Sequence, residues 1–171
     1  MAKRIASINP DANVNCRQCF FLPANQHEFD FSQYDYVVDA VDTVAAKIAI
    51  VLAAKAAGVP VISSMGAGNK VNPAMFEVAD IYKTKVDPLA RVMRQAMKKN
   101  NIKKLKVVYS QELPLLPINE EIESECHAET SKRRALPGSN AFTPSVAGLI
   151  IASEVIKDLV GLDDSHRKGL A

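Results

Sequence analysis

The sequence predicts an α/β fold with parallel strands, and one strand, helix and strand pattern carries the prediction. Residues 35–40 form an apolar, β-branched run that ends near carboxylates, and residues 43–57 follow as a helix rich in Ala, Ile, Val and Leu. Gly58 marks the end of this helix, and residues 59–64 form a second apolar strand. Elements in this order form a right-handed crossover between parallel strands.

The flanking segments complete the outline of the fold. Residues 12–21 alternate loosely between apolar and polar, which predicts a half-buried strand, and residues 22–30 predict a loop or a short irregular helix. Asp87 followed by Pro88 predicts a helix start, because Asp is a preferred N-cap and Pro suits the first helical position. Residues 145–159 predict a last amphipathic helix.

Two carboxylates and a lysine lie where the first of these strands meets its helix. We expect Asp39 and Asp42 at the carboxyl edge of a buried strand, where open α/β sheets bind their ligands. Asp42 has a second interpretation as a helix N-cap, which is the commoner role for this residue type. Lys47, in the same helix, has a second interpretation as a packed or snorkelling side chain.

Four motifs, in order along the chain, resemble a known family. They are Ile-Asn-Pro-Asp at residues 8–11, Val-Asp-Ala-Val-Asp at residues 38–42 with Lys47 beyond, Ser-Met-Gly-Ala-Gly at residues 64–68, and residues 137–145 before the last helix. They resemble the ubiquitin-activating (E1-like) superfamily of adenylating enzymes, in its ThiF/MoeB/HesA family. The tRNA threonylcarbamoyladenosine dehydratase branch is the most similar, through a strand at 80–84, a helix start at 87–91 and a strand at 107–112.

The resemblance implies a Rossmann-like sheet with helices on both faces that lacks the N-terminal Gly-rich βαβ unit. Only seven glycines occur in the chain, and none forms a G-x-G-x-x-G motif near its start. The upstream arginine and lysine that the family uses to contact the triphosphate are missing too. Residues 1–162 are therefore expected to be the C-terminal part of an adenylating domain, with a long crossing loop at about 111–137. Residues 163–171 are expected to form a polar tail.

The resemblance also implies a reaction. ATP would activate a carboxylate as an acyl adenylate, and in the dehydratase branch this is the threonine carboxylate of the modified tRNA, which is then cyclised. Asp39, Asp42 and Lys47 would bind the nucleotide, and Asp42 would also hold Mg²⁺. Neither ATP nor Mg²⁺ is expected to bind well to this chain alone. Two alternatives stay open: an activator of a ubiquitin-like sulfur carrier protein, and a non-catalytic dimerisation fragment.

Cysteine usage gives no firm catalytic residue. Cys126 falls where some members of the superfamily carry a nucleophile, but four glutamates within five residues of it would raise a thiol pKa and suppress the thiolate. We therefore expect Cys126 to be dispensable. Cys16 and Cys19 form a single C-x-x-C with no second pair, so a structural zinc site is not expected.

Charge and composition indicate one globular domain in the cytoplasm. The chain has 171 residues, 48% hydrophobic content and a formal charge of +2. No signal sequence and no run of 18 apolar residues occurs, so no membrane partner is expected. The family implies a homodimer, supported by the last helix. Basic residues are clustered and predict a tRNA-binding patch, unless they form an ordinary solvated face: Lys98, Lys99, Lys103, Lys104, Arg133 and Arg134.

Overall fold

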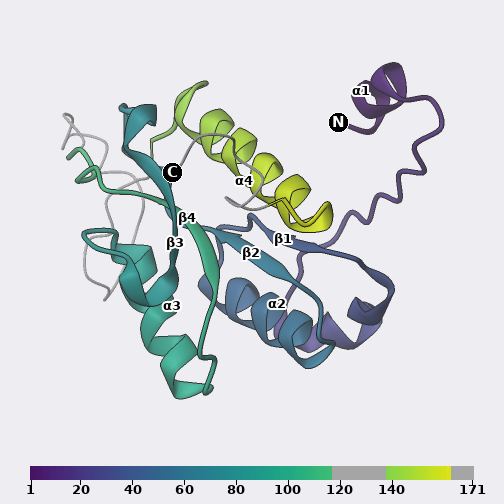
Figure 1. The fold of residues 1–171 in the computed structure, drawn as a ribbon, viewed down its shortest axis with the longest axis horizontal. Helices are drawn as coiled ribbons and strands as arrows, with labels where there is room; N and C mark the ends of the chain where they lie inside the picture. The colour runs from purple at the N-terminus through teal and green to yellow at the C-terminus, as the bar shows by residue number, and fades with distance from the viewer. Residues whose placement is uncertain (117–137, 163–171) are drawn as a thin grey trace, which may run out of the picture.

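The computed structural model describes residues 1–116 and 138–162 and contains one four-stranded sheet (Figure 1). Its strand order is β1-β2-β4-β3. The strands are β1 (Val37–Asp39), β2 (Val61–Ser64), β3 (Phe76–Asp80) and β4 (Lys106–Ser110). β1, β2 and β4 run parallel, whereas β3 pairs with β4 in the antiparallel direction. The predicted parallel crossover from β1 to β2 is confirmed.

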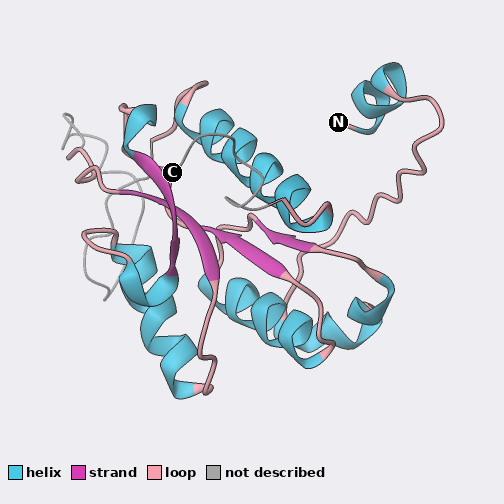
Figure 2. Cartoon of the chain, in the orientation of Figure 1, coloured by secondary structure: helices cyan, strands magenta, loops and turns pink. Residues whose placement is uncertain are grey.

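Helices cover both faces of the sheet, as predicted (Figure 2). α2 (Val44–Ala56) and α3 (Pro88–Lys99) pack on one face, where Val61 and Val107 point. α4 (Thr143–Leu159) packs on the other face, against Ile62 and Val108. Because successive side chains of a strand point to opposite faces, the continuous apolar runs of β2 and β4 can contribute to both cores.

The prediction of a strand at residues 12–21 is wrong. After α1 (Ala2–Ile8) this segment runs without regular structure and is mostly exposed, and Phe20 is 86% exposed. The side chain that packs is Phe21, whose ring meets those of Phe29 and Phe31. A strand needs a neighbour for its backbone groups, and residues 12–21 pair with none of the four described strands.

Short 3₁₀ helices connect the larger elements. The irregular helix expected within residues 22–30 is η1 (Pro23–Glu28), and it is followed by η2 (Phe31–Gln33). η3 (Pro73–Met75) and η4 (Ile81–Lys83) lie on either side of β3.

The strand predicted at residues 80–84 is displaced. The strand is β3, which ends at Asp80, and residues 81–83 form η4. The Asp80 carboxylate accepts the N–H of Tyr82 at 2.9 Å and the N–H of Leu105 at 3.1 Å. Because the first of these bonds caps a 3₁₀ turn, extended structure stops at this residue.

The helix predicted from Asp87 is α3, and the Asp87 carboxylate accepts the N–H of Ala90 at 2.8 Å as its N-cap. The predicted strand at 107–112 is β4, which ends two residues earlier than expected. Among the described residues, no helix combines the length and apolarity needed to cross a lipid bilayer.

Candidate functional site at the carboxyl edge of the parallel strands

The carboxyl ends of β1 and β2 meet at one edge of the sheet, because the two strands are parallel neighbours. Residues 40–43 connect β1 to α2, and residues 65–72 follow β2. Both connections are held by charged side chains that the fold buries.

A buried ion pair holds the turn after β1. The side chains of Asp39 and Lys47 are both 0% exposed, and the Lys47 ammonium lies 3.1 Å from the Asp39 carboxylate. Lys47 also donates a hydrogen bond to the carbonyl oxygen of Val41 at 3.1 Å, while the Asp39 carboxylate accepts the Val41 N–H at 3.4 Å and the hydroxyl proton of Ser63. Both backbone polar groups of Val41 are thus bound to the pair, which fixes the path of the turn.

Burial shapes the ionisation of Lys47. Burial lowers the pKa of Lys47, and the carboxylates of Asp39, Asp42 and Asp87 raise that pKa by less than burial lowers it. Since Asp39 and Lys47 face each other inside the protein, the geometry fits a positioning role better than ligand contact. Their direct contact with ATP stays a prediction.

Asp42 has a different setting from Asp39. Its side chain is exposed and accepts a hydrogen bond from the Thr43 hydroxyl at 3.2 Å. The N-cap of α2 is Thr43, so the capping interpretation of Asp42 is wrong. Asp42 therefore presents a carboxylate to solvent on a turn that the buried pair holds in place.

Asp42 is a single carboxylate ligand, so it suits Mg²⁺ only where other ligands come from water and substrate phosphates. Within residues 1–116 and 138–162, no three His, Cys, Asp or Glu side chains gather as a metal cage. Mg²⁺ at nucleotide sites keeps several waters and takes one or two carboxylates together with substrate phosphates. A single exposed aspartate fits that mode.

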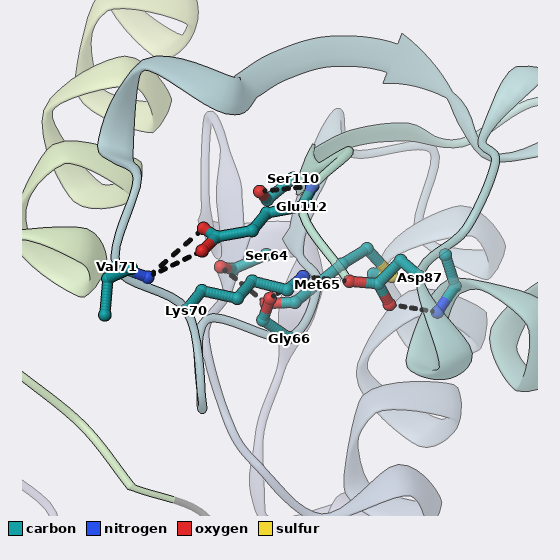
Figure 3. Close-up of polar contacts among 9 residues, drawn as sticks. Ser64, Met65, Gly66, Lys70, Val71, Asp87, Ser110 and Glu112 are labelled. Atoms are coloured by element: carbon teal, nitrogen blue, oxygen red, sulfur yellow. Dashed lines mark hydrogen bonds and ion pairs between the residues drawn. The ribbon is translucent and has the colours of Figure 1, made fainter. Parts of the chain in front are cut away.

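A second buried ion pair holds the loop after β2 (Figure 3). The ammonium of Lys70 lies 2.7 Å from the Asp87 carboxylate, and both side chains are 1% exposed. Lys70 also donates a hydrogen bond to the carbonyl oxygen of Gly66 at 2.7 Å. Because Asp87 caps α3, this pair links the loop to the N-terminus of that helix.

Further contacts bind the same loop to β4 and α4. The carboxylate of Glu112, just beyond β4, accepts the N–H of Val71 at 3.0 Å (Figure 3). The same carboxylate accepts the N–H of Asn72 at 2.9 Å. The side-chain amide of Asn140 donates to the carbonyl of Lys70 at 2.7 Å, and its oxygen accepts the N–H of Thr143 at the start of α4. The loop is thereby a junction between α3, β4 and α4.

Sequence reasoning did not single out Lys70, Glu112 or Asn140. The Asp-Pro pattern identified Asp87 as a cap, but nothing in the pattern indicated that a lysine 17 residues earlier would bind it. The residue with positive φ in this loop is Asn69, at 56°.

The predicted basic patch lies away from this edge. Lys98, Lys99, Lys103 and Lys104 are exposed at the end of α3 and in the turn that leads to Lys106, the first residue of β4. They are therefore at the amino edge of the parallel strands. Arg133, Arg134 and Cys126 lie outside the described residues, as do most of the crossing loop and the polar tail.

Comparisons with known proteins identify relatives of the chain. The tRNA threonylcarbamoyladenosine dehydratase of Bacillus subtilis (strain 168) is 42% identical over 164 residues, which cover 94% of this chain and 64% of the relative. The protein of that name from Haemophilus influenzae is 36% identical over 100 residues, or 58% of this chain and 38% of its own length.

The solved structures include the E. coli tRNA N6-threonylcarbamoyladenosine dehydratase, TcdA, in complex with ATP. It superposes with a TM-score of 0.76 at 26% identity, over 98% of this chain and 64% of that one. The chain thus spans less than two thirds of the length of these relatives. Residues 1–170 match the ThiF family, and the chain belongs to that family.

Proposed function

We propose that this chain forms part of an ATP-dependent adenylating enzyme that acts as a tRNA threonylcarbamoyladenosine dehydratase. The observation that carries the proposal is the exposed Asp42 carboxylate at the carboxyl end of β1, on a turn held by the buried pair of Asp39 and Lys47. Relatives that bear the dehydratase name, and a similar structure in complex with ATP, support it.

In the proposed reaction, a threonine carboxylate oxygen of the tRNA attacks the α-phosphorus of ATP, and pyrophosphate leaves. The acyl adenylate is then closed into a ring by a group of the same modified nucleoside, and AMP leaves. Asp42 would hold Mg²⁺, which neutralises phosphate charge when bound. Asp39 and Lys47 keep the Asp42 turn in position, and Lys70 and Asp87 keep the loop after β2 in position.

The relatives' names favour tRNA over a ubiquitin-like carrier protein as the acceptor. Cys126 is accordingly not assigned a catalytic role. We expect Cys126→Ser to retain tRNA cyclisation, whereas an enzyme that transfers a carrier protein through this thiol would lose the transfer.

ATP–pyrophosphate exchange in the presence of threonylcarbamoyladenosine-modified tRNA tests the proposal. The chain should be inactive alone, because it lacks a G-x-G-x-x-G phosphate loop. It should become active when joined to the segment of the Bacillus subtilis relative that it does not match, a combination called here the two-part enzyme. Exchange by the chain alone would contradict the need for that segment, and a folded two-part enzyme without exchange would contradict the proposed activity.

A homodimer through α4, in the cytoplasm, completes the proposal. Three exposed apolar residues are spaced by seven and four positions and therefore share one side: Leu149 and Ile156 of α4, and Val160 at its C-cap. They are 70%, 61% and 67% exposed, respectively. Sedimentation velocity should show a dimer that Leu149→Glu with Ile156→Glu converts to a monomer. A monomeric starting protein would contradict this part of the proposal.

A further inference from the structure

Five exposed cations line the outer side of α3 and the turn that follows it. Three of these cations, together with the uncharged Gln95, are exposed on one side of the helix, because their positions are spaced by four, three and one residues: Arg91, Gln95, Lys98 and Lys99. Lys103 and Lys104 continue the series toward β4. Residues 88–111 contain no aspartate or glutamate. We call Arg91, Lys98, Lys99, Lys103 and Lys104 the α3 track.

Two neighbouring cations, Arg94 and Lys106, are bound to other parts of the protein. Arg94 turns inward and donates to the carbonyl oxygen of Thr84 at 2.8 Å. Lys106 pairs with Glu154 and Asp158 on the other face of the sheet. Within the described part of the chain, none of the five cations of the α3 track forms an ion pair with a carboxylate. The track is therefore a local concentration of positive charge on a chain of net charge +2.

The helix α3 runs between the two edges of the sheet. The N-terminus of α3 is bound through Asp87 to Lys70, at the edge that carries Asp42. Its C-terminus leads to Lys106, the first residue of β4, at the opposite edge. A helix of 12 residues is about 18 Å long.

We propose that the α3 track binds the phosphate backbone of RNA and guides a tRNA along α3 toward the carboxyl-edge site. This inference rests on the proposed function, because it takes tRNA as the substrate. An anionic membrane fits less well, because the apolar side of α3, with Ala90, Met93 and Met97, is buried in the core and cannot enter lipid. Contacts to phosphates position an RNA without reading its sequence.

Binding of a fluorescently labelled tRNA transcript to the full 171-residue chain, measured by anisotropy without ATP, tests the inference. We expect Lys98→Glu with Lys99→Glu to weaken binding at least about tenfold at low salt, and Lys103→Glu with Lys104→Glu to weaken it similarly. Neutral Lys→Gln changes should each lower the slope of log affinity against log salt by about one. Arg91→Gln should do the same, because the proposed path runs along α3 to the end nearer the site.

The matched control carries the same change in charge at a distance from the α3 track. This control variant, Lys3→Glu with Arg4→Glu, alters two exposed cations of α1. The affinity of the control variant for tRNA should stay within about threefold of that of the original chain. Unchanged circular dichroism and melting temperature establish that each variant is folded. Equal weakening by the control, absence of tRNA binding, or preferential binding to phosphatidylserine vesicles would overturn the inference.

This test separates the inference from the proposed function. Binding that depends on the α3 track and occurs without ATP supports the inference even if the two-part enzyme fails to exchange pyrophosphate. Exchange by a two-part enzyme whose tRNA affinity is insensitive to the α3 track would support the function and overturn the RNA path.

Discussion

Lysines at the two edges of the sheet are used in opposite ways. At the carboxyl edge, Lys47 and Lys70 are buried, and each binds a carboxylate and a backbone carbonyl oxygen. At the amino edge and along α3, the lysines of the α3 track are exposed and have no carboxylate partner among the described residues. The same residue type therefore fixes backbone at one edge and leaves charge available at the other.

The cost of removing a charge from water explains the difference. A buried ammonium must be paired and hydrogen-bonded, so its partners are fixed in place with it. An exposed ammonium keeps its hydration and can exchange solvent ions for phosphates. The comparison predicts that stability depends on the carboxyl-edge lysines and that polyanion binding depends on the α3 track.

The largest expected effect on stability is that of Lys70→Met. The change leaves the Asp87 carboxylate buried beside an uncharged side chain, and loss of one partner of a buried pair costs about 3–5 kcal/mol. Urea denaturation measures the loss. Lys104→Met, on the α3 track, is the matched control and should change stability by less than about 0.5 kcal/mol. A loss below about 1 kcal/mol for Lys70→Met would contradict the comparison.

Adding Asp87→Asn to Lys70→Met sharpens this prediction. The amide oxygen that replaces the carboxylate can still accept the N–H of Ala90 and cap α3, while the unpaired buried charge disappears. The double variant should therefore be more stable than Lys70→Met. A double variant that is less stable would show that the cost does not come from an unpaired charge.

A smaller loss, about 2–4 kcal/mol, is expected for Lys47→Met. Its pair is longer, at 3.1 Å against 2.7 Å, and the Asp39 carboxylate keeps the Ser63 hydroxyl as a donor. Burial lowers the pKa of Lys47, which means that burying the charged ammonium costs free energy. Lys47→Met removes this cost together with the pair, so the net loss of stability is smaller. Urea denaturation of both variants under one set of conditions gives the ranking, and a larger loss for Lys47→Met would reverse it.

A partly exposed cluster should show an intermediate effect that depends on pH. Burial alone would raise the pKa of Asp158, but hydrogen bonds from Lys106 and Tyr36 outweigh it and hold that pKa below its ordinary value of 3.8. Burial would likewise raise the pKa of Glu154, and hydrogen bonds from Lys157 and Lys106 hold it below 4.5. Stability from these groups is present above the ordinary values and is lost as pH falls through the lowered ones.

Melting temperatures between about pH 2.5 and pH 7 measure this loss, with the pH range chosen to span the ordinary carboxyl values of about 4. Lys106→Met should flatten the acid side of the profile, because it removes a partner that lowers the pKa of both carboxyls. An unchanged acid profile would show that Lys106 does not set the ionisation of this cluster.

The smallest effect on stability is expected for Asp42→Asn, the exposed carboxylate of the carboxyl edge. Stability should change by less than about 0.5 kcal/mol, because the side chain is exposed. Loss of a group that holds Mg²⁺ on the phosphates removes several kcal/mol of transition-state stabilisation, so pyrophosphate exchange by the two-part enzyme should fall at least about 100-fold. Asp35→Asn, an exposed aspartate just before β1, is the matched control and should retain exchange.

Sequence patterns alone determined the order and direction of most elements. The apolar runs around Gly58 predicted β1, α2 and β2 as a parallel unit, and Asp87 with Pro88 predicted the start of α3. They also placed Asp39 and Asp42 at the carboxyl edge of the sheet. These features depend on backbone preferences over a few residues, which a short stretch of sequence records.

Only the tertiary structure decided which side chains are paired and which are available. Asp39 is joined to Ser63 across 24 positions, and Lys70 to Asp87 across 17, so no local pattern could assign these partners. The loosely alternating residues 12–21 form no strand, because pairing requires a neighbour that local alternation does not provide. The physical reason is the same in both cases: burial and pairing depend on which distant segments the fold brings together, whereas helix starts and apolar runs depend on residues next to each other in the chain.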